Sequence, residues 1–294
     1  MKPQMRLIFA KTKWEARDLP LQEFLRRAHG EGFSATEINI SELSESPEEI
    51  RALHAAAGLD LVAQFLTDGA TPSEHAASMR QLHRRAVECA PLIVNCHTGR
   101  DCFTFEETLA LFRLSLELEQ ESGIPFCHEL HRGRALYNAP QTLHTLRELP
   151  ALRINADFSH WQVVHESDDL QAHHEAVQAV IDRAWHIHAR VGFSQGPQVP
   201  DPSAPEWAGQ LGICVGWWRR IIAARWAQGA RFLTVSPEFG PEPYMPMVPH
   251  LHRPVADAWE INCWMRRYLS KAFSEGPESG ATSGSDQATL AGLL

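Results

Sequence analysis

Eight short apolar runs alternate with longer amphipathic segments over most of this 294-residue chain, and this alternation constrains its fold more than any other feature. Short apolar runs are typical of buried strands, and apolar residues at helical spacing are typical of helices that cover them. The predicted strands are Arg6–Ala10, Ala35–Ile40, Leu59–Leu66, Leu92–His97, Pro125–Glu129, Arg153–Asp157, Trp185–Arg190 and Phe232–Glu238. The predicted helices are Leu21–His29, Pro47–Ala57, Ser73–Cys89, Phe105–Ser122, Ala139–Leu149, Asp168–Arg183, Glu206–Gln228 and Val255–Phe273. Eight strand–helix units of this total length predict an α/β protein built as a (β/α)8 TIM barrel.

Local signals support these helices and disfavour the competing architecture, a doubly wound open sheet. The segments Ser46–Glu49 (SPEE) and Thr71–Glu74 (TPSE) each place a capping residue, a first-turn proline and an acidic residue in the order that begins a helix. No G-x-G-x-x-G or phosphate-binding loop follows the first predicted strand. We therefore expect one barrel domain over residues 5–273.

Two segments interrupt the alternation. Gly192–Gly212 carries four prolines and is too long for an ordinary strand–helix loop, so we expect either a lid over the barrel mouth or a solvated insertion. Residues 274–294 are rich in glycine, serine and threonine, which predicts a disordered tail.

Composition narrows the partners and the compartment. Lysine and arginine total 27 against 36 aspartates and glutamates, so the formal net charge is −9 with histidine neutral. A net negative surface disfavours nonspecific binding to nucleic acid or to anionic membranes. No run of about 18 apolar residues is present, and Met1–Ala10 lacks the apolar core and cleavage site of a signal peptide. We therefore expect a cytoplasmic protein without a nucleic-acid or membrane partner, whose six scattered cysteines are free thiols.

Lysine is scarce, and its placement limits the chemistry. The chain has four lysines, and none lies between Lys13 and Lys271. A Schiff-base mechanism needs a desolvated lysine, so Lys11 and Lys13 are the only candidates for one. With Trp14 they follow the first predicted strand, where they would either contact a substrate or form a solvated loop.

Metal-competent side chains end four consecutive predicted strands: Glu129, Asp157, His188 and Glu238. Catalytic groups of a TIM barrel lie at such C-terminal strand ends. A single carboxylate there is usually a helix cap or an ion-pair partner, but four metal-competent residues in succession are hard to explain in that way. Three buried carboxylates require a neutralising cation. Oxygen ligands with one imidazole favour Mn²⁺ or Mg²⁺, with Zn²⁺ or Co²⁺ as alternatives.

Strand alternation assigns the neighbouring polar residues. His186, His188 and Arg190 are two apart and share a face, so His188 is the predicted ligand and Arg190 a predicted substrate contact. His186 lies deeper and is predicted to support the site or to pack. His128 faces away from the neighbouring strand-end glutamate and is predicted to be structural. His97 ends the fourth predicted strand and falls near the barrel mouth.

In their order and spacing, these strand ends resemble the xylose isomerase-like TIM-barrel superfamily of sugar isomerases and epimerases. That superfamily includes D-tagatose 3-epimerase, hydroxypyruvate isomerase, inosose dehydratase and endonuclease IV. The family's D-x-x-H pattern matches the segment from Asp157 to His160, and its H-x-H pattern matches the segment from His186 to His188. The resemblance spans residues 5–273, and it implies one metal ion held by Glu129, Asp157, His188 and Glu238.

The resemblance also implies a reaction. A divalent metal on a ketose carbonyl and its adjacent hydroxyl stabilises an enediolate, and two glutamates on opposite faces remove and return a proton. The family assigns these roles to the residues matching Glu129 and Glu238. The predicted substrate-binding residues are His97, His131, Arg132, His160, Arg190, Lys11 and Trp14. The predicted function is a metal-dependent sugar or keto-polyol isomerase or epimerase, and the resemblance implies a homodimer as one assembly.

Three departures from the family patterns narrow this prediction. His131 stands where hydride-shift xylose isomerases have a lysine, which disfavours an aldose isomerase of that type. Ser194 stands where the ketose 3-epimerases have an arginine, which puts 3-epimerase specificity in doubt. Arg190 and Val191 replace the K-D of the H-x-K-D pattern found in many related dehydratases and isomerases.

Three alternatives remain open. A keto-polyol dehydratase or lyase would use the same enolate. An endonuclease IV-like metal phosphodiesterase would need a three-zinc site, but the D-x-H pattern after the seventh strand is missing and the net charge of −9 disfavours DNA. A non-catalytic sugar or metal binder would keep the fold, although no ligand of the predicted set is broken. No glycine-rich phosphate cup follows the seventh or eighth strand, which favours an unphosphorylated substrate.

Overall fold

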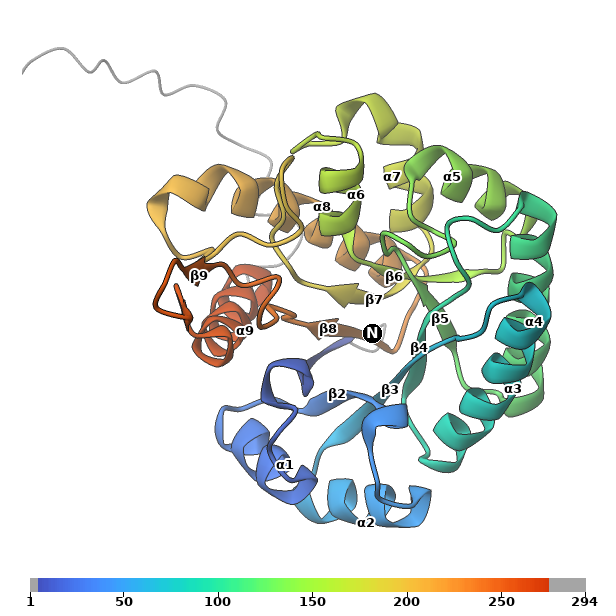
Figure 1. Cartoon of the computed structure of the whole chain (residues 1–294), viewed down its shortest axis with the longest axis horizontal. Coiled ribbons are helices and arrows are strands. Elements are labelled where there is room, and N and C mark those ends of the chain that lie inside the picture. The colour runs from blue at the N-terminus through green and yellow to red at the C-terminus, as the bar shows by residue number, and fades with distance from the viewer. Residues whose placement is uncertain (1–4, 275–294) are drawn as a thin grey trace, which may run out of the picture.

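The structure of the protein, a computed structural model, describes residues 5–274 and confirms the (β/α)8 barrel (Figure 1). Eight parallel strands pair in sequence order, and β1 closes the barrel on β8. The strands are β1 (Arg6–Thr12), β2 (Ala35–Asn39), β3 (Asp60–Leu66), β4 (Ile93–His97), β5 (Phe126–Glu129), β6 (Arg153–Ala156), β7 (Ala184–His188) and β8 (Phe232–Ser236). A short antiparallel hairpin follows β8 and consists of β9 (Met247–Val248) and β10 (Arg253–Pro254).

The helices surround the barrel, as Figure 1 shows. They are α1 (Leu21–Gly30), α2 (Pro47–Ala57), α3 (Pro72–Glu88), α4 (Phe105–Ser122), α5 (Ala139–Glu148), α6 (Phe158–Val164), α7 (His174–Ile181), α8 (Ala208–Ala227) and α9 (Ala258–Ser274). Full capping boxes begin α2 at Ser46, α3 at Thr71 and α4 at Thr104, because each capping hydroxyl and a glutamate three residues later satisfy each other's backbone amides. None of the helices in residues 5–274 combines the length and the apolar character needed to cross a bilayer.

The strand predictions agree with the structure to within two residues at nearly every end, and the helix predictions differ in two places. The short helix α6 was not predicted, because its seven residues are too few to show helical periodicity. The helix predicted over Asp168–Arg183 begins only at His174, after Leu170 adopts a left-handed conformation (φ 53°) that breaks it. The predicted tail over residues 274–294 lies, apart from Ser274, outside the described residues.

The barrel interior is layered, and this layering places the polar site. Alternate residues at the N-terminal ends of five strands form an apolar plug: Ile8, Ala10, Ala35, Val62, Ile93 and Cys127. The next inward positions toward the C-terminal ends are polar, among them Glu37, Asn95, Asn155 and His186. The plug therefore closes one end of the barrel, and the polar side chains gather at the other.

The long segment after β7 is neither a lid over the cavity described below nor a solvated insertion. Val199 is fully buried, and its amide donates to the Val191 carbonyl at 2.9 Å. The side chain of Gln198 exchanges two hydrogen bonds with the backbone of Gly240, at 3.1 and 2.8 Å. No residue of 192–212 is among those that line the cavity. The segment instead packs against the loop that follows β8.

Candidate metal centre and active site

The four predicted metal ligands come together at the C-terminal ends of adjacent strands. Glu129 ends β5, Asp157 follows β6, His188 ends β7, and Glu238 lies two residues beyond β8. One ligand atom from each residue lies within 4.8 Å of those of the other three, and all four residues are buried. Neighbouring parallel strands present their last inward side chains at one level, so the closed barrel gathers these residues into one cluster.

The donor set fits a divalent metal. Within residues 5–274, Glu129 Oε1, His188 Nδ1 and Glu238 Oε2 are buried and have no hydrogen-bond partner. His188 Nδ1 lies 2.7 Å from Glu238 Oε2, but the two atoms are not aligned for a hydrogen bond. Buried polar atoms normally have partners, and a cation bound here would satisfy all three atoms at once. Three carboxylates and one imidazole are ligands that suit Mn²⁺ or Mg²⁺.

The pKa shifts of the cluster reflect an excess of carboxylate charge. Burial raises the pKa of Asp157 above its ordinary value, against the pull of the neighbouring Arg190 guanidinium. Burial would lower the pKa of His188, but Glu238, Glu37 and Glu129 hold it well above its ordinary value. Both pKa values are therefore shifted upward. A divalent cation would neutralise the same excess charge.

Arg190, the predicted substrate contact, also belongs to this cluster. Its guanidinium pairs with Asp157 and lies 3.4 Å from Glu238 Oε2, and its Nε donates to Ser159 Oγ at 3.1 Å. Burial opposes its charge, but Asp157 and Glu238 raise its pKa above its ordinary value. Because Arg190 also lines the cavity, it presents a fixed positive charge both to the ligand carboxylates and to any molecule bound there.

Glu37, at the C-terminal half of β2, is a central residue of the site that the sequence did not reveal. Burial would raise its pKa, but His188 and His186 hold it well below the ordinary value, so Glu37 is ionised. Its oxygens lie 2.9 Å from His188 Nε2 and 2.9 Å from His186 Nε2. His186 thus has the supporting role predicted for it. The signal available in the sequence was an acidic residue at the centre of a predicted strand, ATEIN.

Three histidines extend the site beside Glu129. The ring centroids of His97 and His131 are 4.6 Å apart, and those of His131 and His160 are 3.9 Å apart. His97 Nε2 lies 2.8 Å from Glu129 Oε2, and His160 Nε2 lies 3.0 Å from the Arg190 guanidinium. Burial lowers the pKa values of His131 and His160 well below their ordinary value, so both rings are neutral near pH 7. Neutral imidazoles can donate to or accept from hydroxyl groups.

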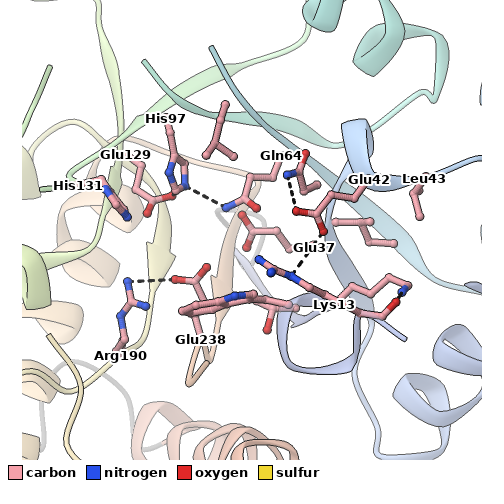
Figure 2. Close-up of a pocket in the computed structure, with 16 residues that line it drawn as sticks. Lys13, Glu37, Glu42, Leu43, Gln64, His97, Glu129, His131, Arg190 and Glu238 are labelled. Atoms are coloured by element: carbon pink, nitrogen blue, oxygen red, sulfur yellow. Dashed lines mark hydrogen bonds and ion pairs between the residues drawn. The ribbon is translucent and has the colours of Figure 1, made fainter. Parts of the chain in front are cut away.

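A cavity of about 350 Å³ opens above the cluster (Figure 2). Six of the predicted site residues line it: Trp14, His97, Glu129, His131, Arg190 and Glu238. The unpredicted Glu37, Gln64 and Glu42 also line it. Figure 2 shows His131, Glu129 and His97 at one end and Lys13, Glu42 and Leu43 at the other. A ligand in this cavity would lie against both glutamates of the proposed acid/base pair.

Three predicted substrate contacts do not line the cavity. His160 is fully buried, with Nε2 3.0 Å from the Arg190 guanidinium. Lys11 is fully buried on the outer face of β1, where its ammonium group pairs with Glu15 and lies 4.1 Å from the centre of the Trp259 ring. Side chains alternate between the two faces of a strand. Ala10 in the apolar plug and Thr12 at the cavity both face inward, so Lys11 between them faces outward. Lys11 is therefore removed from the substrate-binding set.

Arg132 is likewise not among the cavity-lining residues, because its guanidinium stacks 4.9 Å from the centre of the Tyr244 ring. His128 faces the helix layer, where its two ring nitrogens lie 2.7 Å from the hydroxyls of Thr98 and Ser115. Burial lowers the pKa of His128 to about 3. This buried, fully hydrogen-bonded and neutral ring has the structural environment that strand alternation predicted.

Comparison with known proteins finds similar folds among solved structures. No family model matches the chain, and no curated protein matches its sequence. Among solved structures it is similar to a probable 3-DHS dehydratase from Bacillus anthracis, with 16% identity, 91% of this chain and 99% of that chain covered, and a TM-score of 0.58. It is also similar to 3-keto-D-glucoside 4-epimerase from E. coli (15% identity, 89% and 100% covered, TM-score 0.58). A third similar structure is AP endonuclease, family 2, from Brucella melitensis (14% identity, 89% and 98% covered, TM-score 0.60).

These three proteins carry different activities on one architecture, so the likeness establishes the fold and leaves the reaction to be argued from the site. The chain has the fold of the xylose isomerase-like TIM-barrel proteins, as its strand ends led us to expect.

Proposed function

We propose that the protein is a divalent-metal-dependent isomerase or epimerase of a small sugar or keto-polyol. The observation that carries the proposal is the buried cluster of Glu129, Asp157, His188 and Glu238, in which three ligand atoms lack hydrogen bonds within residues 5–274. Glu129 and Glu238 of this cluster also line the cavity. The cavity volume of about 350 Å³ is near the lower end for small-molecule sites, which suits a single small polar substrate. We propose Mn²⁺ or Mg²⁺ as the metal.

The chain's own residues would move the proton. Glu129 or Glu238 takes the proton from the carbon next to the substrate carbonyl, and the electron pair of the broken C–H bond moves onto the carbonyl oxygen. In an epimerisation the second glutamate, which carries a proton at the start, gives it to the other face of that carbon. In an isomerisation a proton goes to the former carbonyl carbon, and the proton of the adjacent hydroxyl moves to the former carbonyl oxygen. The bound metal supplies positive charge that stabilises the enediolate oxygens. Arg190 and the neutral imidazole of His131 hold the remaining hydroxyls in place.

The first test is metal content measured by plasma mass spectrometry on wild type and Asp157→Ala, both purified without chelator. We expect about one equivalent of a divalent metal in wild type and a loss of most of it in the variant, because Asp157 supplies one of four ligands. Wild type that takes up no metal after reconstitution with excess Mn²⁺, Mg²⁺, Zn²⁺ and Co²⁺ would refute the proposal. Close to three zinc ions per chain would instead favour a phosphodiesterase like endonuclease IV.

The second test follows the reaction by proton NMR in D₂O with a panel of unphosphorylated ketoses and keto-polyols. We expect metal-dependent exchange of the proton next to the carbonyl, together with appearance of the isomer or epimer. Glu129→Gln and Glu238→Gln should each abolish turnover, and Glu148→Gln, on the exposed surface at the end of α5, should retain it. Release of water with formation of an unsaturated product would identify a dehydratase. Metal and sugar binding without exchange would identify a binding protein.

A further inference from the structure

The strongest feature that the proposed function leaves unexplained is the carboxylate of Glu37. This side chain is 2% exposed and reaches from β2 across the barrel interior to three other strands. Its Oε1 lies 2.9 Å from Asn95 Nδ2 and 2.9 Å from His188 Nε2. Its Oε2 lies 2.6 Å from Ser236 Oγ and 2.9 Å from His186 Nε2. Each oxygen therefore has two donors, which is a complete set for a carboxylate.

The hydrogen bond between His188 Nε2 and Glu37 determines that the other ring nitrogen, Nδ1, faces the carboxylate cluster. A carboxylate that accepts from Nε2 requires a proton on that nitrogen. A cation that replaces the second ring proton therefore meets the lone pair of Nδ1. Nδ1 lies 2.7 Å from Glu238 Oε2, 3.5 Å from Glu129 Oε2 and 3.8 Å from Asp157 Oδ2. Nδ1 thus faces the three carboxylates of the cluster, and the nearest of these oxygens, Glu238 Oε2, has no hydrogen-bond partner in residues 5–274.

Glu37 is itself close enough to two histidines to be considered a metal ligand, because Glu37, His186 and His188 form a second potential ligand group. The hydrogen-bond pattern argues against that role. Neither Glu37 oxygen nor His186 Nε2 is among the buried atoms without partners in residues 5–274, whereas Glu129, His188 and Glu238 each contribute one. His186 is held in turn, with Nδ1 2.7 Å from Thr234 Oγ1. We therefore assign Glu37 and His186 a supporting role and the cluster of Glu129, Asp157, His188 and Glu238 the role of binding the metal.

We propose that Glu37 is a positioning residue for the metal centre: it holds His188 in the Nε2–H tautomer and orients the Nδ1 lone pair toward Glu129, Asp157 and Glu238. The inference rests on the proposed metal site. A carboxylate in this position also increases the basicity of the imidazole, and removal of such a partner typically costs 10- to 100-fold in metal affinity. His186, Ser236 and Asn95 fix Glu37 in turn and keep it from binding the cation directly.

Two variants of Glu37 distinguish the effect of losing the hydrogen-bond acceptor from the effect of losing its negative charge. Glu37→Met removes the acceptor with little change in volume, and it should raise the Kd for Mn²⁺, measured by calorimetry, by about 10- to 100-fold. Glu37→Gln can keep an amide oxygen opposite His188, because His186 and Ser236 can also accept from the amide nitrogen. It should therefore recover part of the lost affinity. Glu42→Met, a carboxylate that lines the same cavity without touching the cluster, is the matched control and should bind Mn²⁺ like wild type.

A spectroscopic measurement on wild type covers the case in which Glu37→Met does not fold. In the Zn²⁺-loaded protein, two-bond proton–nitrogen correlations of the assigned His188 ring should show a proton on Nε2 and the metal on Nδ1. A proton on Nδ1, or Kd values for Glu37→Met equal to wild type in a folded protein, would overturn the positioning role while leaving the metal site intact. Wild type that binds no metal would instead refute the proposed function, so the two failures are distinguishable.

Discussion

Gly240 provides a test of how the cavity wall is built. This glycine lies two residues after Glu238, and a Cβ placed on it would come within 2.1 Å of two carbons of the Trp14 ring. Ordinary contact begins at 3.4 Å, so the ring would have to retreat by more than 1 Å. The φ of Gly240 lies outside the left-handed range, so alanine can adopt its backbone conformation. Gly240→Ala therefore changes packing against Trp14 rather than backbone strain.

The expected cost follows from where Trp14 lies. Its ring packs edge-on against Tyr244, with 4.9 Å between centroids, and lies 5.7 Å from the Arg190 guanidinium. Overpacking at such a contact costs about 1–3 kcal/mol, so Gly240→Ala should lower the free energy of unfolding in urea by that amount. Since Trp14 lines the cavity, the KM of the active substrate should change as well.

Controls make the Gly240 prediction decisive. Gly216→Ala, in α8 with nothing within 4 Å of the added methyl group, should stabilise by about 0.5–1 kcal/mol. In a Trp14→Ala background the Gly240→Ala substitution should cost little, because the clashing ring is absent. The reasoning is refuted if Gly240→Ala is as stable as wild type, or if its cost persists without the Trp14 ring.

Three further predictions test the rest of the account. Lys11→Met should lose about 3 kcal/mol of stability, as expected for a broken buried ion pair, and leave KM unchanged; a raised KM would return Lys11 to the substrate site. Burial lowers the pKa of His83 from its ordinary 6.5 to about 4, so the unfolded chain binds an extra proton between these values and stability falls as pH drops through 6.5. His83→Phe should therefore lose about 2 kcal/mol less than wild type between pH 7 and pH 5, measured by urea unfolding; equal losses would contradict it. Mn²⁺ at a hundredfold its Kd should raise the free energy of unfolding by about 2.7 kcal/mol and chelator should reverse the gain, whereas Asp157→Ala should show no such response.

Much of the fold could be predicted because its signals are local or periodic. The apolar runs, the first-turn prolines and the capping boxes at Ser46 and Thr71 act within a few residues of each other, and they place most strands and helices. Helix α6 escaped prediction because its seven residues are too few to show helical periodicity, although Asp157 caps its N-terminus.

Strand alternation was informative wherever it was applied. It separated His128 from Glu129 and related His186 to His188, and the structure places all four as alternation requires. The expectation for Lys11 ignored the same rule and relied on its place after the first strand. Because Thr12 faces the cavity, its neighbour Lys11 must face the helices.

The sequence by itself determined the barrel and the four residues that meet at its C-terminal rim, because each of them lies at the end of a strand or within two residues of it and the closed sheet has one such rim. Only the tertiary structure decided what surrounds them. The partners of Glu37 lie 58, 149, 151 and 199 residues away along the chain, and no local pattern encodes contacts at that separation. The closure of the barrel through β1 brings β2 within side-chain reach of β7 and β8, and this places Glu37 against His186, His188 and Ser236.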